Sequence, residues 1–282
     1  MQALKRSTRC LETLKERFEN GMKRTPIRID PADFPTEFWD MLRRARVYDS
    51  SCSPEARVYY LEADCGYYLK TAPHGTLANE ASMAQYFHQK GLGAEVIAYR
   101  SLDRDYLLTA RVPGEDCTHA VYLARPEYLC DLLAERLRML HEEAYEGCPV
   151  MRRMDGYLQT VRENRPKGVF DPSYFAGYGN ESAPKELYRI AMMGESKFQN
   201  DTLLHGDYCL PNVMLEDWRF SGFIDLGQGG VGDRHVDLFW GAWTLSYNLK
   251  TDAYRNRFFD AYGKDTVDFE RLRIVAACEC FG

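Results

Sequence analysis

The spacing of hydrophobic and polar residues divides the 282-residue chain into stretches of different period. In residues 3–19, apolar or small positions recur every three or four residues, which predicts an amphipathic helix ending near Gly21. Residues 35–46 share this period and predict a second helix. Further on, apolar residues fall instead into short β-prone runs at 56–61, 67–70, 95–100 and 106–111.

A helix is predicted between the second and third of these runs. Residues 77–90 have helical spacing, with Thr76 as the expected N-cap and Gly91 as the expected stop. The first part of the chain therefore reads as a small antiparallel sheet with one inserted helix.

The chain after Val112-Pro113-Gly114 is predicted to be mainly helical. Residues 126–143 place five leucines on one face, which indicates a core helix. Residues 144–185, rich in proline and glycine, are expected to be loop. Further helices are expected at 186–193, 235–249 and 269–278, and short strands at 202–205, 213–216 and 220–225.

This layout predicts an α+β protein with two lobes. We expect a helical extension over residues 1–30, a small β-rich lobe over 31–111 and a larger, mainly helical lobe over 112–282.

Composition argues for a globular protein of the reducing cytoplasm. The chain is 45% hydrophobic and 28% charged, and no apolar run approaches the roughly 18 residues of a membrane helix. The amino terminus lacks the apolar core of a signal peptide, so we expect neither export nor membrane association. The nine cysteines are scattered without a CxxC pair, which favours free thiols over a zinc site.

The charge distribution bears on the partner. A net charge of −6 argues against nucleic-acid binding. Residues 1–46 hold 11 Lys/Arg and 7 Asp/Glu, whereas the remainder holds 25 and 35. This acidic remainder either attracts a cationic small molecule or is simply a solvated surface.

The candidate chemistry lies between His205 and Asp225. The stretch His205-Gly206-Asp207-Tyr208-Cys209-Leu210-Pro211-Asn212 is followed by a predicted hairpin and then Ile224-Asp225-Leu226-Gly227. Phosphoryl transfer needs an acceptor oxygen aimed in line and metal ions on the phosphate oxygens. Asp207 could accept the hydroxyl proton, and the oxygens of Asn212 and Asp225 suit Mg²⁺.

The HxDxxxxN pattern followed by D-x-G resembles the protein-kinase-like fold. In its HGD form, and with SGFIDLG, it is similar to the aminoglycoside phosphotransferase family, in particular the 3'-phosphotransferase branch. The resemblance extends from about Pro35 to the carboxyl terminus. It implies that residues 31–111 are the nucleotide-binding lobe and residues 112–282 the catalytic and acceptor-binding lobe. It implies a bilobal kinase-like fold and an antibiotic-resistance enzyme that moves the γ-phosphoryl group of ATP or GTP, with Mg²⁺, onto a hydroxyl of an aminoglycoside.

The resemblance also assigns nucleotide-binding residues. Lys70 would hold the α- and β-phosphates and Glu80 would pair with it, although taken alone both could be surface residues. Tyr68 would face the cleft and stack on the purine, or else be a core aromatic. Hydroxyls or amides of Ser51 and Ser53 would cover the phosphates. The base edge would meet the carbonyl of Ala110 and the amide of Val112 in the hinge.

On the acceptor side, the resemblance assigns Glu279 and the terminal carboxylate of Gly282, with Asp171 and Glu181 from a variable insertion. It also implies that Asp237 braces the catalytic loop and that His205 orients the loop without acting as base. Gln228 replaces the arginine that often follows IDLG, Cys278 stands where the family often has Asp, and the insertion is more aromatic than acidic.

Three functions remain open at this point. The first is an aminoglycoside O-phosphotransferase acting on a cationic small molecule as a monomer or homodimer. The second is a kinase of another small hydroxylated metabolite or antibiotic. The third is a nucleotide-binding regulator without turnover, which the presence of Lys70, Glu80, Asp207, Asn212 and Asp225 disfavours.

Overall fold

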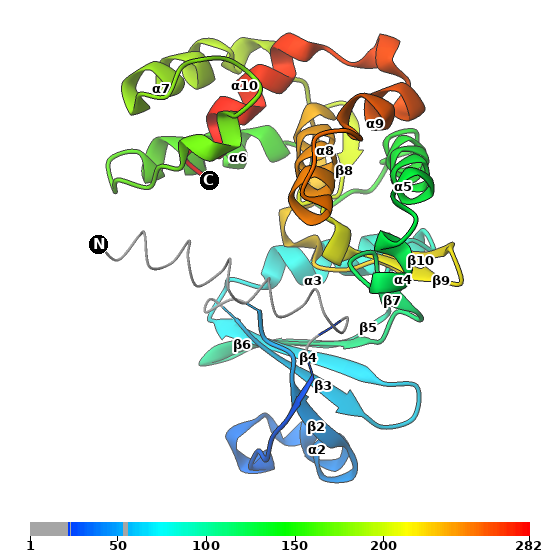
Figure 1. Cartoon of the computed structure of the whole chain (residues 1–282). Coiled ribbons are helices and arrows are strands. Elements are labelled where there is room, and N and C mark those ends of the chain that lie inside the picture. Colours follow the sequence, from blue (N-terminus) through cyan, green and yellow to red (C-terminus); the bar gives the residue numbers. More distant parts are fainter. Residues whose placement is uncertain (1–21, 23, 53–55) are drawn as a thin grey trace. The chain divides into compact units, whose positions relative to one another are not determined.

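The computed structural model describes residues 22, 24–52 and 56–282 (Figure 1). The helix expected over residues 3–19 lies outside these. The chain divides into two compact units. The first consists of Met1–Ala124 and Pro211–Gly227, and the second of Arg125–Leu210 and Gln228–Gly282. The predicted α+β class is confirmed.

The largest sheet of the first unit has six antiparallel strands (Figure 1). Its strand order is β1-β2-β3-β4-β6-β5, and neighbouring strands pair antiparallel throughout. The strands are β1 (Thr25–Pro26), β2 (Arg46–Asp49), β3 (Arg57–Glu62), β4 (Tyr67–Pro73), β5 (Val96–Ser101) and β6 (Arg104–Ala110). Alternation along the strands buries Leu61 and Leu69 against Phe38 and Tyr106 in one core cluster.

The helix α3 (Ala78–Gln89) is inserted between β4 and β5, as predicted, but its expected cap is wrong. Thr76 donates its hydroxyl to the carbonyl of Pro73 and caps nothing. The amides of Gly75 and Leu77 instead donate to the carboxylate of Asp105 at 2.9 and 2.8 Å. A buried carboxylate from β6 is the stronger acceptor for these amides near the helix start.

The helix predicted over 35–46 is only partly correct. A 3₁₀ turn η1 (Pro31–Asp33) comes first, then η2 (Thr36–Phe38) and α2 (Trp39–Arg44). Ala45 is extended, and the next four residues form β2, which pairs with β3. Hydrogen bonding to the sheet therefore ends the helix earlier than local periodicity suggests.

A three-stranded sheet of order β10-β9-β7 completes the first unit. Its members are β7 (Glu115–Asp116), β9 (Val213–Glu216) and β10 (Arg219–Phe223), with helix α4 (Ala120–Leu123) after β7. The 3₁₀ turns η5 (Leu210–Asn212) and η6 (Leu226–Gln228) flank the β9–β10 hairpin. This hairpin is the one predicted within the catalytic segment.

The second unit is mainly helical, with one two-stranded sheet of β8 (Thr202–Leu204) and β11 (Gly230–Gly232). Leu129, Leu133 and Leu137 of α5 are completely buried or nearly so, as their spacing predicts. The helices are α5 (Pro126–His141), α6 (Arg153–Asn164), α7 (Pro184–Met193), α8 (His235–Leu249), α9 (Arg255–Tyr262) and α10 (Phe269–Glu279), with 3₁₀ turns η3 (Pro172–Phe175), η4 (Glu195–Lys197) and η7 (Lys264–Thr266).

The loop predicted over 144–185 is wrong in its middle, where α6 forms. This helix buries Met154, Leu158 and Val161, spaced four and three residues apart. Only one narrow face is apolar, and the prolines and glycines on either side obscure it. Helix α9 was also missed, although it buries Phe258, Phe259 and Tyr262.

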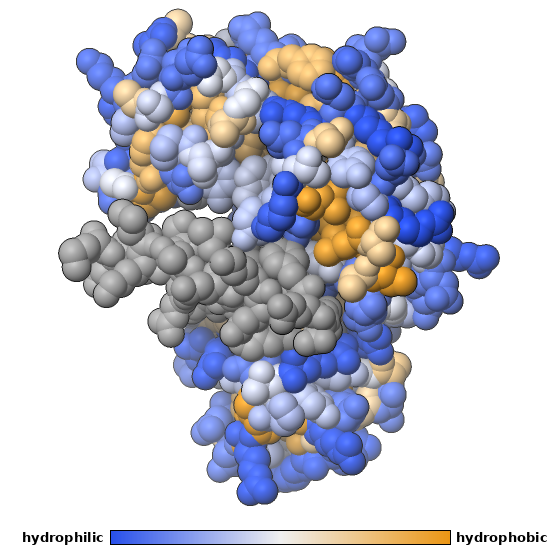
Figure 2. Space-filling model, viewed as in Figure 1, coloured by the Kyte–Doolittle hydropathy of each residue, from blue (hydrophilic) through white to orange (hydrophobic). Residues whose placement is uncertain are grey.

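The visible surface is mostly hydrophilic, with small hydrophobic areas (Figure 2). Large apolar side chains exposed in the described part of the chain are scattered along the sequence, for example Leu102, Val121, Met139 and Met193. Within the same residues, no helix is both long enough and apolar enough to cross a membrane.

Candidate active site

In the first unit, Lys70 bridges two carboxylates. Its Nζ atom lies 2.9 and 2.7 Å from the two carboxylate oxygens of Glu80 on α3. It also lies 2.9 Å from Oδ1 of Asp225, which follows β10. Burial opposes the positive charge, but the charges of Asp225 and Glu80 raise the pKa of Lys70 above its ordinary value. The predicted Lys70–Glu80 pair is confirmed as a contact, and Asp225 joins it.

Asp225 and Asn212 lie at the two ends of the β9–β10 hairpin. The amide of Ile224 donates to the backbone carbonyl of Asn212 at 3.1 Å, which brings the two ends together. Asp225 has a φ of 60°, in the left-handed region that few residues other than glycine, asparagine and aspartate adopt. Its side chain is 52% exposed although it contacts Lys70.

These side chains fit a magnesium ion. Mg²⁺ prefers hard oxygen ligands such as those of amides and carboxylates. Proteins usually hold it with only one or two side chains. The trio of Lys70, Glu80 and Asp225 carries two acidic groups and one basic group, so a bound cation would offset the excess negative charge.

Of the residues expected around the nucleotide, Ser51 and Tyr68 already have protein partners. The hydroxyl of Ser51 accepts from the amide of Val58 at 2.9 Å. Tyr68 lies two residues before Lys70 on β4, with its ring centroid 5.2 Å from that of Tyr60. Its hydroxyl lies 3.1 Å from Sδ of Met22 and accepts from Arg24 at 3.4 Å. Ser53 lies outside the described residues.

Of the expected hinge residues, Ala110 is the last residue of β6 and Val112 follows two residues later. The amide of Ala110 donates to the carbonyl of Glu95 at 2.9 Å, and Ala110 pairs with Tyr67 across the sheet. Val112 is buried and packs closely on Gly222. A Cβ atom added to Gly222 would lie only 3.0 Å from the side chain of Val112. Both positions are therefore fixed by the sheets of the first unit.

In the second unit, Asp237 holds the loop that carries Asp207. This aspartate, in the first turn of α8, is completely buried. Its two carboxylate oxygens accept the backbone amides of His205 and Gly206, each at 2.8 Å. Nε2 of His141 also lies 3.3 Å from Oδ2. The predicted brace is confirmed.

His205 also acts on the loop itself. Its ring is completely buried, and its Nδ1 accepts the backbone amide of Asp207 at 3.3 Å. A buried ring already accepting this bond is poorly placed to act as a base. Gly206, between the two residues, has a φ of 84°, which requires glycine.

Glu279, the carboxylate predicted to bind the acceptor, is 7% exposed. The hydroxyl of Tyr157 donates to its Oε1 at 2.8 Å. Burial raises the pKa of Glu279 to about 7, and the charge of Asp207 adds to this, while Tyr157, Arg153 and Trp240 act in the opposite direction. Gly282, three residues later, donates its amide to the carbonyl of Glu279 at 3.1 Å.

The other two predicted acceptor residues have partners as well. Asp171 caps η3 by accepting the amide of Ser173 at 2.9 Å. Its own amide donates to the carbonyl of Cys280 at 2.8 Å, so it lies beside the chain end. Glu181 forms an ion pair with Arg273 of α10. This pairing offsets the charge that Glu181 was expected to offer.

Sequence reasoning missed Arg153 and Tyr157, because α6 was assigned to a loop. Arg153 donates from Nε to the carbonyl of Gln228 at 2.7 Å, and Tyr157 holds Glu279. The apolar spacing within 153–164 was the signal that could have found this helix.

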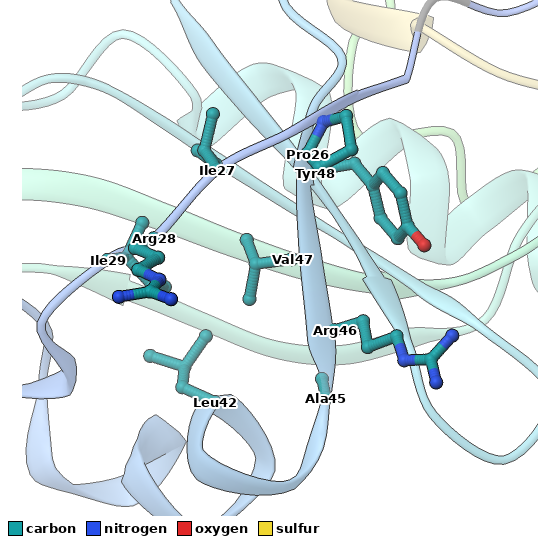
Figure 3. A pocket seen from close by; sticks show the side chains of 9 residues that line it. All are labelled: Pro26, Ile27, Arg28, Ile29, Leu42, Ala45, Arg46, Val47 and Tyr48. Atoms are coloured by element: carbon teal, nitrogen blue, oxygen red, sulfur yellow. The ribbon is translucent and has the colours of Figure 1, made fainter.

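A cavity of about 570 Å³ lies elsewhere in the first unit (Figure 3). Residues 26–29, 42 and 45–48 line it, next to the edge strand β1. None of the residues predicted to act in catalysis or binding lines it.

In kinase-like phosphotransferases, a lysine on a strand pairs with a glutamate on a helix, close to an aspartate that binds the metal ion. Lys70, Glu80 and Asp225 have this arrangement. The chain belongs to the phosphotransferase enzyme family, whose model matches residues 54–275.

Named relatives support this membership. A "Probable aminoglycoside 3'-phosphotransferase" of Lactococcus lactis subsp. lactis (strain IL1403) is 47% identical over 257 residues, covering 91% of this chain and 98% of that protein. An aminoglycoside 3'-phosphotransferase of Streptomyces fradiae is 31% identical over 222 residues, covering 73% of this chain and 81% of that protein.

Solved structures show the same fold. Aminoglycoside phosphotransferase APH(3'')-Id from Streptomyces rimosus ATCC10970, in complex with ADP and streptomycin, has a TM-score of 0.69. It is 22% identical and covers 87% of this chain and 97% of its own. The type VIII aminoglycoside-3'-phosphotransferase has a TM-score of 0.67 at 21% identity, covering 88% of this chain and 100% of its own. The predicted kinase-like fold is confirmed.

Proposed function

We propose that this phosphotransferase transfers the γ-phosphoryl group of ATP or GTP to the 3'-hydroxyl of an aminoglycoside, with Mg²⁺. The observation that carries the chemistry is the contact of Lys70 with both Glu80 and Asp225. The relative that is 47% identical over 91% of the chain supports the acceptor.

Five residues have a task in this reaction. Asp207 takes the proton as the acceptor hydroxyl oxygen bonds to the γ-phosphorus, while the bond to the β–γ bridging oxygen breaks and the nucleoside diphosphate leaves. Lys70, oriented by Glu80, binds the α- and β-phosphates. Asn212 and Asp225 would hold Mg²⁺, which neutralises phosphate charge when bound.

The acceptor side has few carboxylates to bind a polycation. Glu279 and Asp171 lie beside Cys280 and Gly282, whereas Glu181 is paired with Arg273. Glu279 becomes fully anionic only above about pH 7, so binding of a cationic acceptor should strengthen as the pH rises through that value.

The decisive experiment compares two acceptors that differ in one hydroxyl. Nucleoside diphosphate release is measured with kanamycin B and with its 3'-deoxy analogue. Stimulation by the first and not the second supports the proposal. Background hydrolysis alone, unaffected by either compound, would favour a different small hydroxylated acceptor, and nucleotide binding without turnover would favour a regulator.

The assignment of Asp207 is tested separately. Asp207→Asn should abolish transfer while nucleotide affinity stays within about threefold, because the residue acts on the acceptor hydroxyl. A collapse of nucleotide affinity would contradict this role.

We further propose that the enzyme acts in the cytoplasm. The eight cysteines in the described ranges are all free thiols, which suits a reducing compartment.

A further inference from the structure

Arg153, at the start of α6, binds Gln228 through two of its nitrogens. Nε donates to the backbone carbonyl of Gln228 at 2.7 Å, and Nη2 donates to the side-chain Oε1 of the same residue. The two residues are 75 positions apart in the sequence. Guanidinium presents its donors in a rigid fork, so it can bind both oxygens at once.

The carbonyl that Arg153 binds lies directly against the catalytic loop. A Cβ atom added to Gly206 would overlap the carbonyl oxygen and carbon of Gln228. Gly206 also donates its amide to Oδ1 of Asp237 at 2.8 Å. The residue preceding Asp207 is therefore held by Asp237 and in close contact with the Gln228 backbone.

The two hydrogen bonds from Arg153 restrict the position of Gln228. Its side chain is exposed, and it is the last residue of the short turn η6. It is also the first residue of the chain to return to the second unit after Gly227. Exposed residues at such a junction move easily unless hydrogen bonds hold them.

We propose that Arg153 is a positioning residue for the catalytic loop, which fixes the Gln228 carbonyl against Gly206 and thereby holds Asp207 in its reactive position. This inference rests on the proposed role of Asp207 as the base. It assigns a function to α6, a helix that supplies none of the residues predicted for catalysis.

Arg153 is partly removed from water and lies beside Tyr157. Its guanidinium carbon lies 6.0 Å from the ring centroid of Tyr157, the residue that donates to Glu279. Burial lowers the pKa of Arg153, although the negative charges of Glu279 and Asp237 act in the opposite direction. A partly buried guanidinium costs desolvation energy, which the two bonds to Gln228 offset.

The test compares substitutions at two adjacent arginines. Arg153→Met removes both donors, Arg153→Lys keeps a donor for the carbonyl alone, and Gln228→Ala keeps the carbonyl alone. Arg152→Met is the matched control, because Arg152 is exposed and pairs with Asp155 at 2.7 Å. For each variant, kcat, the KM for nucleotide, the melting temperature and the acceptor-free rate of nucleotide hydrolysis are measured.

Arg153→Met should lower kcat about 10- to 100-fold, because a displacement on the order of 1 Å has effects of that size. The KM for nucleotide should stay within about twofold and the melting temperature near that of Arg152→Met. Arg153→Lys should recover part of kcat. Gln228→Ala should lower kcat less than Arg153→Met does. The double variant should have a kcat close to that of Arg153→Met alone, because both substitutions act through the same contact.

A kcat for Arg153→Met within about threefold of Arg152→Met would overturn the proposal. If Arg153→Met does not fold, Arg153→Lys decides: unchanged kcat would refute the proposal, and a loss of more than about threefold with unchanged KM would support it. If the wild-type enzyme phosphorylates no aminoglycoside, the proposed acceptor fails. The variants are then compared by their acceptor-free rates of nucleotide hydrolysis, a reaction in which water takes the place of the acceptor hydroxyl.

Discussion

The buried carboxylate of Glu279 should make the stability of the protein depend on pH, and Glu279→Gln should remove that dependence. The carboxylate is 7% exposed and accepts a hydrogen bond from Tyr157. Glutamine keeps the shape and an oxygen for Tyr157 but cannot ionise. The comparison therefore isolates the cost of the buried charge.

The magnitude follows from the pKa. Burial raises the pKa of Glu279 from an ordinary 4.5 to about 7. A difference of that size corresponds to roughly 3 kcal/mol, at about 1.36 kcal/mol per pKa unit. The native state keeps a proton that the unfolded chain releases, so this stabilisation is complete below pH 4.5 and is lost as the pH rises through 7. Between pH 5.5 and 8, the wild-type protein should lose about 2 kcal/mol from this group.

Urea unfolding at several pH values, followed by circular dichroism and tryptophan fluorescence, measures the effect. The free energy of unfolding of Glu279→Gln, relative to wild type, should rise by about 2 kcal/mol between pH 5.5 and 8. Glu135→Gln, an exposed change on α5, should run parallel to wild type. A difference between Glu279→Gln and wild type that stays constant across this range would refute the reasoning.

Three further changes test the other parts of the site. Lys70→Met should weaken nucleotide binding at least 10-fold by calorimetry, because two carboxylates lose their shared cation; an effect no larger than that of the exposed Lys185→Met would contradict this. Asp237→Ala should lower the free energy of unfolding by about 3 to 5 kcal/mol in urea, because two buried amides lose a charged acceptor; a loss under about 1 kcal/mol would show that water replaces it. Gly206→Ala should lower kcat at least 100-fold, whereas Gly75→Ala, at a similar φ but with open space, should leave kcat near wild type; equal effects would mean that φ alone matters.

Much of the fold and part of the site could be predicted from sequence because the signals are local. Helices α5 and α8 follow the apolar spacing, and the hairpin after Asn212 follows short β-prone runs. The Lys70–Glu80 contact was predicted from the family resemblance, which places the lysine on a strand and the glutamate on the next helix. The brace from Asp237 was anticipated by family resemblance and not by spacing.

Other features depend on partners that are distant in the sequence. The cap of α3 comes from Asp105, 28 residues beyond Leu77, and displaces the local candidate Thr76. The contact of Tyr68 with Arg24 spans 44 residues. No local pattern reveals which distant carboxylate or cation will be nearest.

The sequence by itself predicted the class of chemistry, because the residue types and the spacing of Asp207, Asn212 and Asp225 indicate phosphoryl transfer. The tertiary structure decided the environment of that chemistry. Packing buries Glu279 beside Tyr157, and it brings Arg153 to Gln228 and so to the loop of Asp207. The physical reason is that pKa values and loop positions depend on burial and on distant charges, which exist only once the chain has folded.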